Sequence, residues 1–233
     1  MGRTSTIAIT SAEKASGLWE CLTPEEREYL NNNFIVKHCR KNELVYAEGD
    51  TPRDLLCLVQ GKVKIFKEGV GGRSQIVRIV KAAEYFGYRA MLADEQYVTS
   101  AVAIENSTIY AIPGPVFITL LKQNHELAFL FIKALATDLG ISDSRSVNLT
   151  QKHIRGRLAE TLLFLKDTYG YEYDGATISI YLSRYDLASL SNMTSSNVTR
   201  TLALFANEKI ITIDGRKIKI IDEESLRRIC KCG

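Results

Sequence analysis

Short apolar runs, several of them alternating with polar residues, fill the first half of the chain, and glycine-containing turns separate them. Such runs lie at 44–46, 55–59, 62–65, 76–80, 99–104 and 108–112. Alternation over these lengths is typical of strands with one buried face. Strands at this spacing predict an all-β barrel, roll or sandwich over about 34–113.

The residues before this region predict a helix. Thr23 occupies the N-cap position, Pro24 the first helical position, and Glu26 closes a capping box. Three apolar residues are expected to anchor this segment to a core: Leu18, Trp19 and Leu22.

From about 115 to 147 a helical period replaces the alternation. One stripe advances in steps of four and three residues, a heptad spacing with two polar positions: Leu127, Phe131, Ala134, Asp138, Ile141 and Arg145. A second apolar stripe holds Leu130, Leu135 and Leu139. A helix that is apolar on two sides needs two partners, one of which is expected to be a second copy of the chain. The alternative is a single helix buried within one monomer.

A hinge is predicted over 146–156, which is polar and contains a glycine. An amphipathic helix over 158–165, a loop over 169–175 and a short strand over 177–181 are expected to follow. The hinge therefore separates the long helical region from a C-terminal domain.

Two short helices joined by a tight turn are predicted next. Ser183 and Asp186 form a capping box for the first helix, residues 191–193 make the turn, and Thr194 caps the second helix. The inner face of the second helix carries Val198, Leu202 and Phe205. Two short helices with such a turn are the signature of a helix-turn-helix.

The outer face of the second helix is suited to nucleic acid. At about 100° per residue, Ser196 and Arg200 point away from the apolar side, and Thr199 flanks them. Short side chains let the helix approach base edges, and the arginine fork matches guanine O6 and N7. Free N–H groups near Thr194 suit a phosphate. Three further side chains are expected to reach phosphates: Ser183, Ser195 and Asn197.

A basic hairpin follows these helices. The runs 210–213 and 217–221 alternate around Asp214-Gly215, which is a strong hairpin signal. Arg216, Lys217 and Lys219 make the hairpin basic. A helix-turn-helix followed by such a hairpin is a winged helix, and the wing is expected to lie along a DNA backbone. The alternative is a small α+β domain whose polar helix face is only solvated.

The charge distribution agrees with a nucleic-acid partner at this end of the chain. The formal net charge is +3, and the excess lies in 151–233, where 13 basic residues face 10 acidic ones. A polyanion is therefore expected to bind there. The hydrophobic share of 45% and the length of 233 residues fit a globular protein with two modest domains.

Cysteine usage and the chain start bear on location. The five cysteines form no C-x-x-C pair, and the first ten residues lack the regions of an export signal. No apolar run approaches the roughly 20 residues that span a bilayer. We expect a cytoplasmic protein with reduced thiols, no membrane association, and a mobile tail carrying Cys230 and Cys232.

Several motifs strengthen this order of elements: E-G-D at 48–50, L-V-Q-G-K-V at 58–63, Y-F-G at 85–87, R-L-A-E-T-L-L at 157–163 and the stretch 182–219. Together they resemble the CRP/FNR family of bacterial transcription regulators, over about 18–226. The resemblance implies a homodimer on a palindromic double-stranded DNA site, an effector in the β-roll that shifts the long helices, and RNA polymerase as a partner. It also implies that Arg200 contacts guanine. Ser196 stands where many members carry a glutamate that accepts from cytosine N4.

The effector region departs from the members that bind cyclic AMP. Those have Phe-Gly-Glu and a later arginine before Ser or Thr, whereas here Tyr88 follows Gly87 and Val98 precedes Thr99. Cyclic AMP is therefore not expected. Gly87, Tyr88, Arg89 and Thr99 remain as the candidate pocket of an unidentified effector, with Arg89 interpreted as a surface or salt-bridge residue.

No cofactor or metal site is assigned. The closely spaced N-terminal cysteines of iron–sulfur members are absent, since 18-residue steps separate Cys21, Cys39 and Cys57. Cys39 and Cys57 are interpreted as small buried hydrophobes. No spacing favours a haem ligand among His38, His125 and His153. The sequence lacks H-E-x-x-H, P-loop and G-x-S-x-G motifs, so no enzyme activity is expected.

The predicted fold class is α+β, with an N-terminal cyclic-nucleotide-binding-like β-roll (a jelly roll), a long dimerisation helix and a C-terminal winged helix-turn-helix. The predicted boundaries are 1–114 for the β-roll sensor, 115–149 for the dimerisation helix region and 150–233 for the DNA-binding domain. The expected function is a dimeric, sequence-specific transcription regulator controlled by a small-molecule, redox or gas signal. The alternative is a cyclic-nucleotide-binding-like sensor module that does not bind DNA.

Overall fold

The computed structural model describes residues 17–232, so the first ten residues, which lack the regions of an export signal, lie outside the described residues. Backbone contacts divide the chain into two compact units. We call the first, which holds Ile76–Leu139 and the residues up to Glu68, the roll unit. The second, which holds Gly69–Gln75 and the residues from Gly140 onward, is called the winged-helix unit. No helix among residues 17–232 is long and apolar enough to cross a membrane.

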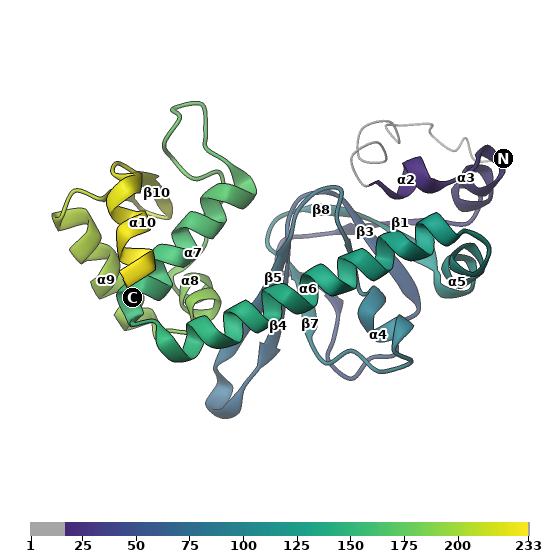
Figure 1. The fold of residues 1–233 in the computed structure, drawn as a ribbon, viewed down its shortest axis with the longest axis horizontal. Helices are drawn as coiled ribbons and strands as arrows, with labels where there is room; N and C mark the ends of the chain where they lie inside the picture. Colours follow the sequence, from purple (N-terminus) through teal and green to yellow (C-terminus); the bar gives the residue numbers. More distant parts are fainter. Residues whose placement is uncertain (1–16, 233) are drawn as a thin grey trace. The chain divides into compact units, whose positions relative to one another are not determined.

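The roll unit contains two antiparallel four-stranded sheets, which confirms the predicted β-roll (Figure 1). The first sheet has the order β1 (Ile35–Cys39), β8 (Ser107–Pro113), β3 (Asp54–Gln60), β6 (Tyr85–Phe86). The second has the order β2 (Leu44–Tyr46), β7 (Ser100–Ala103), β4 (Val63–Glu68), β5 (Ser74–Val80).

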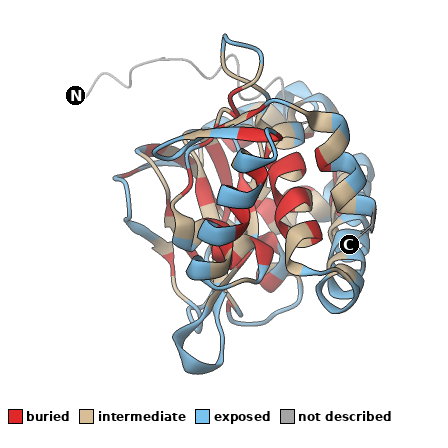
Figure 2. Cartoon of the chain, turned by 90° about the vertical axis from the view of Figure 1, so that its left-hand side faces the viewer, coloured by how far each residue is buried: buried red, intermediate tan, exposed pale blue. Residues whose placement is uncertain are grey.

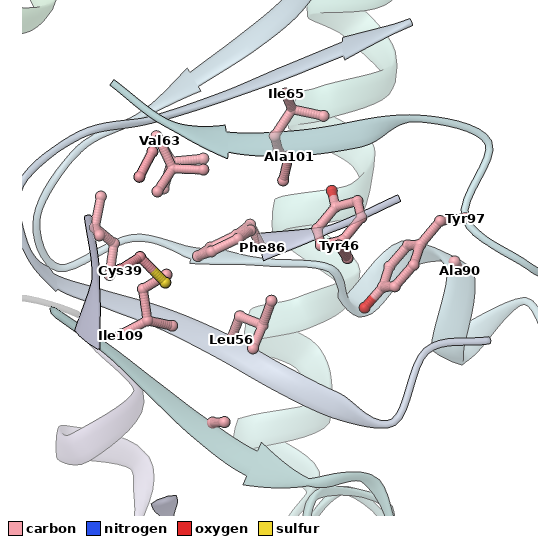
Figure 3. Close-up of a cluster of buried hydrophobic side chains, with 14 residues drawn as sticks. Cys39, Tyr46, Leu56, Val63, Ile65, Phe86, Ala90, Tyr97, Ala101 and Ile109 are labelled. Carbon is pink, nitrogen blue, oxygen red and sulfur yellow. The ribbon is translucent and has the colours of Figure 1, made fainter. Parts of the chain in front are cut away.

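An apolar core fills the space between the two sheets. Tyr46 and Tyr97 stack with ring centroids 3.8 Å apart, and Phe86 is 1% exposed beside them (Figure 3). Leu58 and Ile109 from the first sheet and Val63 and Ala101 from the second are fully buried in the same cluster: each has 0% exposure. The alternating strand pattern therefore turns its apolar side chains into this core.

The turn between β3 and β4 requires glycine. Gly61 has φ +96°, a conformation that other residues rarely adopt, and a Cβ at this position would overlap the Ser107 side chain and the Asn106 carbonyl. The Gln60-Gly61-Lys62 turn seen in the sequence thus lets the β3–β4 connection pass directly against the loop before β8.

Helices cover one side of the roll: α2 (Leu18–Cys21), α3 (Pro24–Asn31), α4 (Tyr88–Leu92), α5 (Gly114–Gln123) and the first part of α6 (His125–Gln151). The predicted capping box of α3 is confirmed, because Thr23 accepts from the Glu26 N–H and the Glu26 side chain accepts from the Thr23 N–H. A second apolar cluster joins these helices to the roll, with Leu18, Phe117 and Leu127 almost completely buried.

The helical region after the roll differs from the prediction in two respects. It is two helices, because Asn124 ends α5 and its side chain accepts from the Leu127 N–H at the start of α6. The predicted hinge over 146–156 is wrong in extent, since α6 continues to Gln151. The hydroxyl groups of Ser146 and Thr150 donate to backbone carbonyls four and three residues earlier, so these polar side chains are hydrogen-bonded within the helix. The break is confined to 152–153.

The predicted dimer seam does not form an open face on α6. Leu127 and Phe131 are 0% and 3% exposed and pack into the roll unit's own core, with Ala134 partly buried beside them. Asp138 accepts hydrogen bonds from Tyr88 and Arg78 of the same unit. The remaining two seam residues are not in that core: Ile141 is exposed and the Arg145 guanidinium lies 5.6 Å from the Phe164 ring. The heptad spacing thus marks mainly the face that α6 turns toward its own protomer.

The winged-helix unit contains α7 (Ile154–Tyr169), α8 (Arg184–Ser191), α9 (Ser195–Asn207), the hairpin of β9 (Ile211–Asp214) and β10 (Lys217–Ile220), and α10 (Glu223–Cys232). These helices are buried on one face and exposed on the other (Figure 2). The predicted strand over 177–181 is reduced to two isolated bridges, Tyr171 to Ile178 and Thr177 to Lys219.

The C-terminal tail is a helix rather than the expected mobile segment. Asp222 accepts from the Ser225 N–H at its start, and Leu226 is completely buried. Glu223 accepts from Lys166 at 2.9 Å, from Arg227 at 2.8 Å and from the Tyr171 hydroxyl at 3.1 Å. The hydrogen bond from Lys166 is the largest of several influences that lower the pKa of Glu223 from 4.5 to about 2.

Glu223→Gln should therefore reduce stability in a pH-dependent way. Because the folded-state pKa is below the unfolded-state value, the carboxylate's contribution is complete above about pH 4.5 and is lost as the pH falls through 2. The side chain is 34% exposed, so we expect a loss of up to about 1 kcal/mol at pH 7. Urea unfolding at pH 7, 5 and 3 should show a shallower acid loss for the variant. Glu224→Gln, an exposed neighbour, is the control; identical pH slopes for Glu223→Gln and the native protein would contradict this role.

Candidate nucleic-acid interface

The helix-turn-helix is set by two side-chain caps and one left-handed residue. The Ser183 hydroxyl accepts from the Asp186 N–H at the start of α8, and Thr194 accepts from the Asn197 N–H at the start of α9. Asn192 has φ +51°, a conformation that Asn tolerates better than most residues, and it ends α8. These local preferences place the two helices as the sequence predicts.

Helix α9 has one buried and one exposed face. Val198, Leu202 and Phe205 are at most 1% exposed, whereas Ser196 and Arg200 on the opposite side are exposed. Thr199 and Ser195 are exposed as well. The helical period therefore predicted both faces correctly.

Hydrogen bonds within α9 organise its exposed side chains. Arg200 donates from Nη2 to Asn197 Oδ1 at 2.9 Å, which uses one of the five N–H groups of the guanidinium. Thr194 Oγ1 and Ser196 Oγ lie 3.0 Å apart, and the Thr199 hydroxyl donates to the Ser195 carbonyl. Asn197, predicted to reach a phosphate, thus also holds the side chain of Arg200.

Ser183 is less suited to a phosphate than the sequence indicates. Its hydroxyl donates to Asp186 Oδ2 at 2.6 Å while it caps α8, so its single proton is already used. Arg184 is a residue that sequence reasoning missed. Its Nη2 donates to the Gly215 carbonyl at 3.1 Å and so joins the start of α8 to the tip of the wing. The only sequence signal for it was a basic residue directly after an N-cap.

The wing is a two-residue hairpin in which Asp214 pairs with Lys217. Gly215 has φ +56°, whereas the φ of Arg216 is not positive. Glycine is therefore needed only at the first central position of the turn. Arg216 is exposed at the tip, and the Lys217 ammonium lies 5.7 Å from the Tyr181 ring. Lys219 pairs with Asp174 at 3.3 Å, so that charge is partly compensated.

The side chains of two candidate effector residues, Tyr88 and Arg89, already have partners in the roll unit. Arg89 pairs with Glu95 at 2.9 Å, in agreement with its interpretation as a salt-bridge residue. Tyr88 is buried and donates to Asp138 Oδ2 at 3.0 Å; burial, followed by the Asp138 charge, raises its pKa to about 12. Gly87, the N-cap of α4, and Thr99 lie beside the stacked tyrosine pair.

Those two residues adjoin the roll core itself. A Cβ on Gly87 would come within 3.1 Å of the Tyr97 hydroxyl. Burial raises the pKa of Tyr46, and the nearby Thr99 side chain acts in the opposite direction. The rings of Tyr46, Tyr97 and Phe86 occupy the interior at this place (Figure 3). Burial raises the pKa of Tyr97 strongly, which agrees with a closed apolar interior.

An apolar hollow lies on the other side of the first sheet, between it and helices α2 and α3. Its lining residues are Trp19, Leu30, Asn31, Phe34, Cys57, Val59, Tyr85, Tyr110 and Ile112.

Within residues 17–231, no three His, Cys, Asp or Glu side chains gather into a potential metal site.

Comparisons with known proteins agree with this geometry. The cyclic nucleotide-binding domain family matches residues 36–124, and the Crp-like helix-turn-helix domain family matches residues 156–229. A "CRP-like cAMP-activated global transcriptional regulator" of Mycobacterium tuberculosis is 23% identical over 214 residues, which is 91% of this chain and 96% of that protein. The "Anaerobic regulatory protein" of Bacillus subtilis is 27% identical, over 88% of this chain and 87% of that protein.

The fold is also similar to solved structures. FixK2 from Bradyrhizobium japonicum has a TM-score of 0.76 and 20% identity, over 84% of this chain and 96% of that one. The two matched domains define a helix-turn-helix transcription regulator with a cyclic-nucleotide-binding-like roll. The chain belongs to the CRP/FNR family, whose members are transcription regulators and not enzymes.

Proposed function

We propose that this protein reads a specific double-stranded DNA sequence through the exposed face of α9. The observation that carries the proposal is Arg200, exposed between the short side chains of Ser196 and Thr199 and backed by the buried Val198 and Leu202. Small neighbours let the guanidinium approach base edges, where it matches guanine. The remaining exposed groups at the start of α9, Ser195 and Thr194, and the wing residues Arg216 and Lys217 are assigned to phosphates.

The proposed regulator is a homodimer that uses a different face of α6 from the one the heptad pattern indicates. Phe129, Ile132 and Leu139 are 52%, 57% and 63% exposed, and the helical period places all three on a different side of α6 from Leu127 and Phe131. Large apolar side chains exposed along one helix face mark a protein interface. A two-fold dimer would present one α9 to each half of a palindromic site, and the family implies RNA polymerase as a further partner.

The proposed signal is not cyclic AMP. Tyr88 stands where cyclic-AMP-binding members carry glutamate, and it is directed to Asp138 of α6. Val98 stands in the place of their arginine and is exposed, and the stacked tyrosines fill the adjacent interior. These two positions therefore supply neither the cation nor the acceptor that hold the cyclic phosphate and the ribose in those members. A small-molecule, redox or gas signal of another kind is proposed to act on the roll.

Selection from a random-sequence duplex library tests this function. The wild-type protein should enrich a palindrome. For each phosphate contacted, the logarithm of its binding constant should fall by about 0.9 for a tenfold increase in salt concentration. Light scattering on the same preparation measures whether the protein is a dimer. Failure to enrich any sequence at low salt would favour a sensor module that does not bind DNA.

A further inference from the structure

The first turn of α7 contacts the residue that follows α9 and the turn that precedes α9. At the carboxyl end, Arg155 donates from its two terminal nitrogens to the two carboxylate oxygens of Glu208, each at 2.7 Å. Glu208 is the C-cap residue of α9. Paired parallel hydrogen bonds of this kind fix orientation as well as distance.

The second contact lies just before the amino end of α9. Arg157 donates from Nη1 to the Asn192 carbonyl at 3.0 Å, and Asn192 is the left-handed residue of the turn between α8 and α9. Arg155 and Arg157 are two residues apart on α7, so their side chains leave that helix in different directions. One turn of α7 thus contacts the C-cap of the 13-residue helix α9 and the turn that precedes this helix.

The Arg155 contact is also packed. Its guanidinium lies 5.2 Å from the ring of Phe205, which is completely buried and anchors the inner face of α9. The hydrogen bonds from Arg155 lower the pKa of Glu208, which favours the ionised carboxylate that the pair needs. Both side chains are partly exposed, so the pair contributes modestly to stability. Its geometry constrains position more than it stabilises the fold.

We propose that Arg155 and Arg157 are positioning residues that fix the pose of the reading helix relative to α7. This inference rests on the proposed function, since it concerns how accurately α9 meets base edges. Side chains that recognise a ligand must be held within about half an ångström of their productive places. Because α7 begins directly after the break at 152–153, a change in direction there carries α9 with it as one piece.

Direct phosphate contact by Arg155 is the competing explanation. The two explanations predict opposite changes in DNA affinity for Glu208→Ala. If Arg155 acts only through its charge, Arg155→Ala weakens all DNA binding and Glu208→Ala strengthens it, because an anion is removed. If the pair positions α9, both substitutions weaken binding to the selected sequence. The double swap R155E/E208R then restores it, since the pair is remade at constant net charge.

The decisive measurement compares affinities for the duplex that the wild type selects and for a scrambled duplex of equal composition. We expect Arg155→Ala and Glu208→Ala each to lower the affinity for the selected duplex by about three- to tenfold. The ratio of the affinities for the selected and the scrambled duplex should also decrease. The swap should recover at least half of the loss on a logarithmic scale. Arg157→Lys, which keeps a donor for the Asn192 carbonyl, should be closer to wild type than Arg157→Ala. Glu224→Ala, an exposed acid on α10, is the control for charge removal.

Amide hydrogen exchange without DNA separates this inference from the proposed function. Both single variants should exchange faster in α9 than the wild type, and the swap should return to wild-type protection. Tighter binding by Glu208→Ala, or unchanged protection of α9 in both single variants, would overturn the positioning role. If the wild type selects no sequence but the variants still show altered protection of α9, the proposed DNA function is wrong. The positioning of α9 by Arg155 and Arg157 would then still hold.

Discussion

Replacing Arg200 by alanine should weaken binding to the selected operator by about 5- to 150-fold, or roughly 1–3 kcal/mol. The loss should be confined to sequences that carry guanine at one position of each half-site, because Arg200 is the residue on the exposed face of α9 that matches its O6 and N7. The preferred base at that position should relax, while neighbouring positions keep their preference. Competition with a panel of single-base operator variants measures this directly.

Two substitutions serve as controls for this prediction. Arg200→Lys keeps the charge but loses the fork, so it should also lose base preference. Lys217→Ala removes a wing charge and should weaken all sequences about equally, with a salt slope reduced by about one. A uniform loss for Arg200→Ala across the panel would show that this arginine contacts only the backbone.

Introducing a charge on the exposed face of α6, by Ile132→Glu, should dissociate the proposed dimer. A carboxylate buried without a partner in an apolar interface costs at least about 3 kcal/mol, and a two-fold dimer would bury two of them. Ile132 is 57% exposed in the protomer, so the substitution should leave the folded monomer largely intact. Sedimentation should show a monomer at micromolar concentration, and operator affinity should fall to that of a single half-site.

Ile141→Glu is the matched control for the dimer face. Ile141 is likewise exposed, at 49%, but belongs to the stripe that includes Leu127 and Phe131. The same chemical change there should leave a dimer. If Ile141→Glu dissociates the protein and Ile132→Glu does not, the seam derived from the heptad spacing is the interface and the opposite face is not.

The elements that depend on local chemistry were predictable from the sequence. Thr23, Ser183 and Thr194 each cap a helix, and the Gly61 and Gly215 turns are where the pattern places them. Caps and turns involve neighbours in the chain, so their signals are complete within a few residues. The two faces of α9 followed from the helical period for the same reason.

Features that depend on contacts between distant segments were not predictable. The spacing of Leu127 and Phe131 defines a stripe on α6, but not whether a second protomer or the chain's own roll covers it. Tyr88 is a candidate for the effector pocket because it follows Phe86-Gly87, where cyclic-AMP-binding members carry glutamate. The hydrogen bond of its hydroxyl to Asp138, 50 positions later, has no signal in the sequence. Helix α10 was missed although Asp222 and the acids that follow it are typical of a helix start.

The Asp138 carboxylate connects two segments of the roll to α6. A tyrosine from the segment after β6 and an arginine from β5 both donate to the same oxygen, at 3.0 and 3.2 Å. Neither segment can move without changing the hydrogen bonds of the long helix. Hydrogen bonds between protein groups thus couple the positions of both segments to the position of α6.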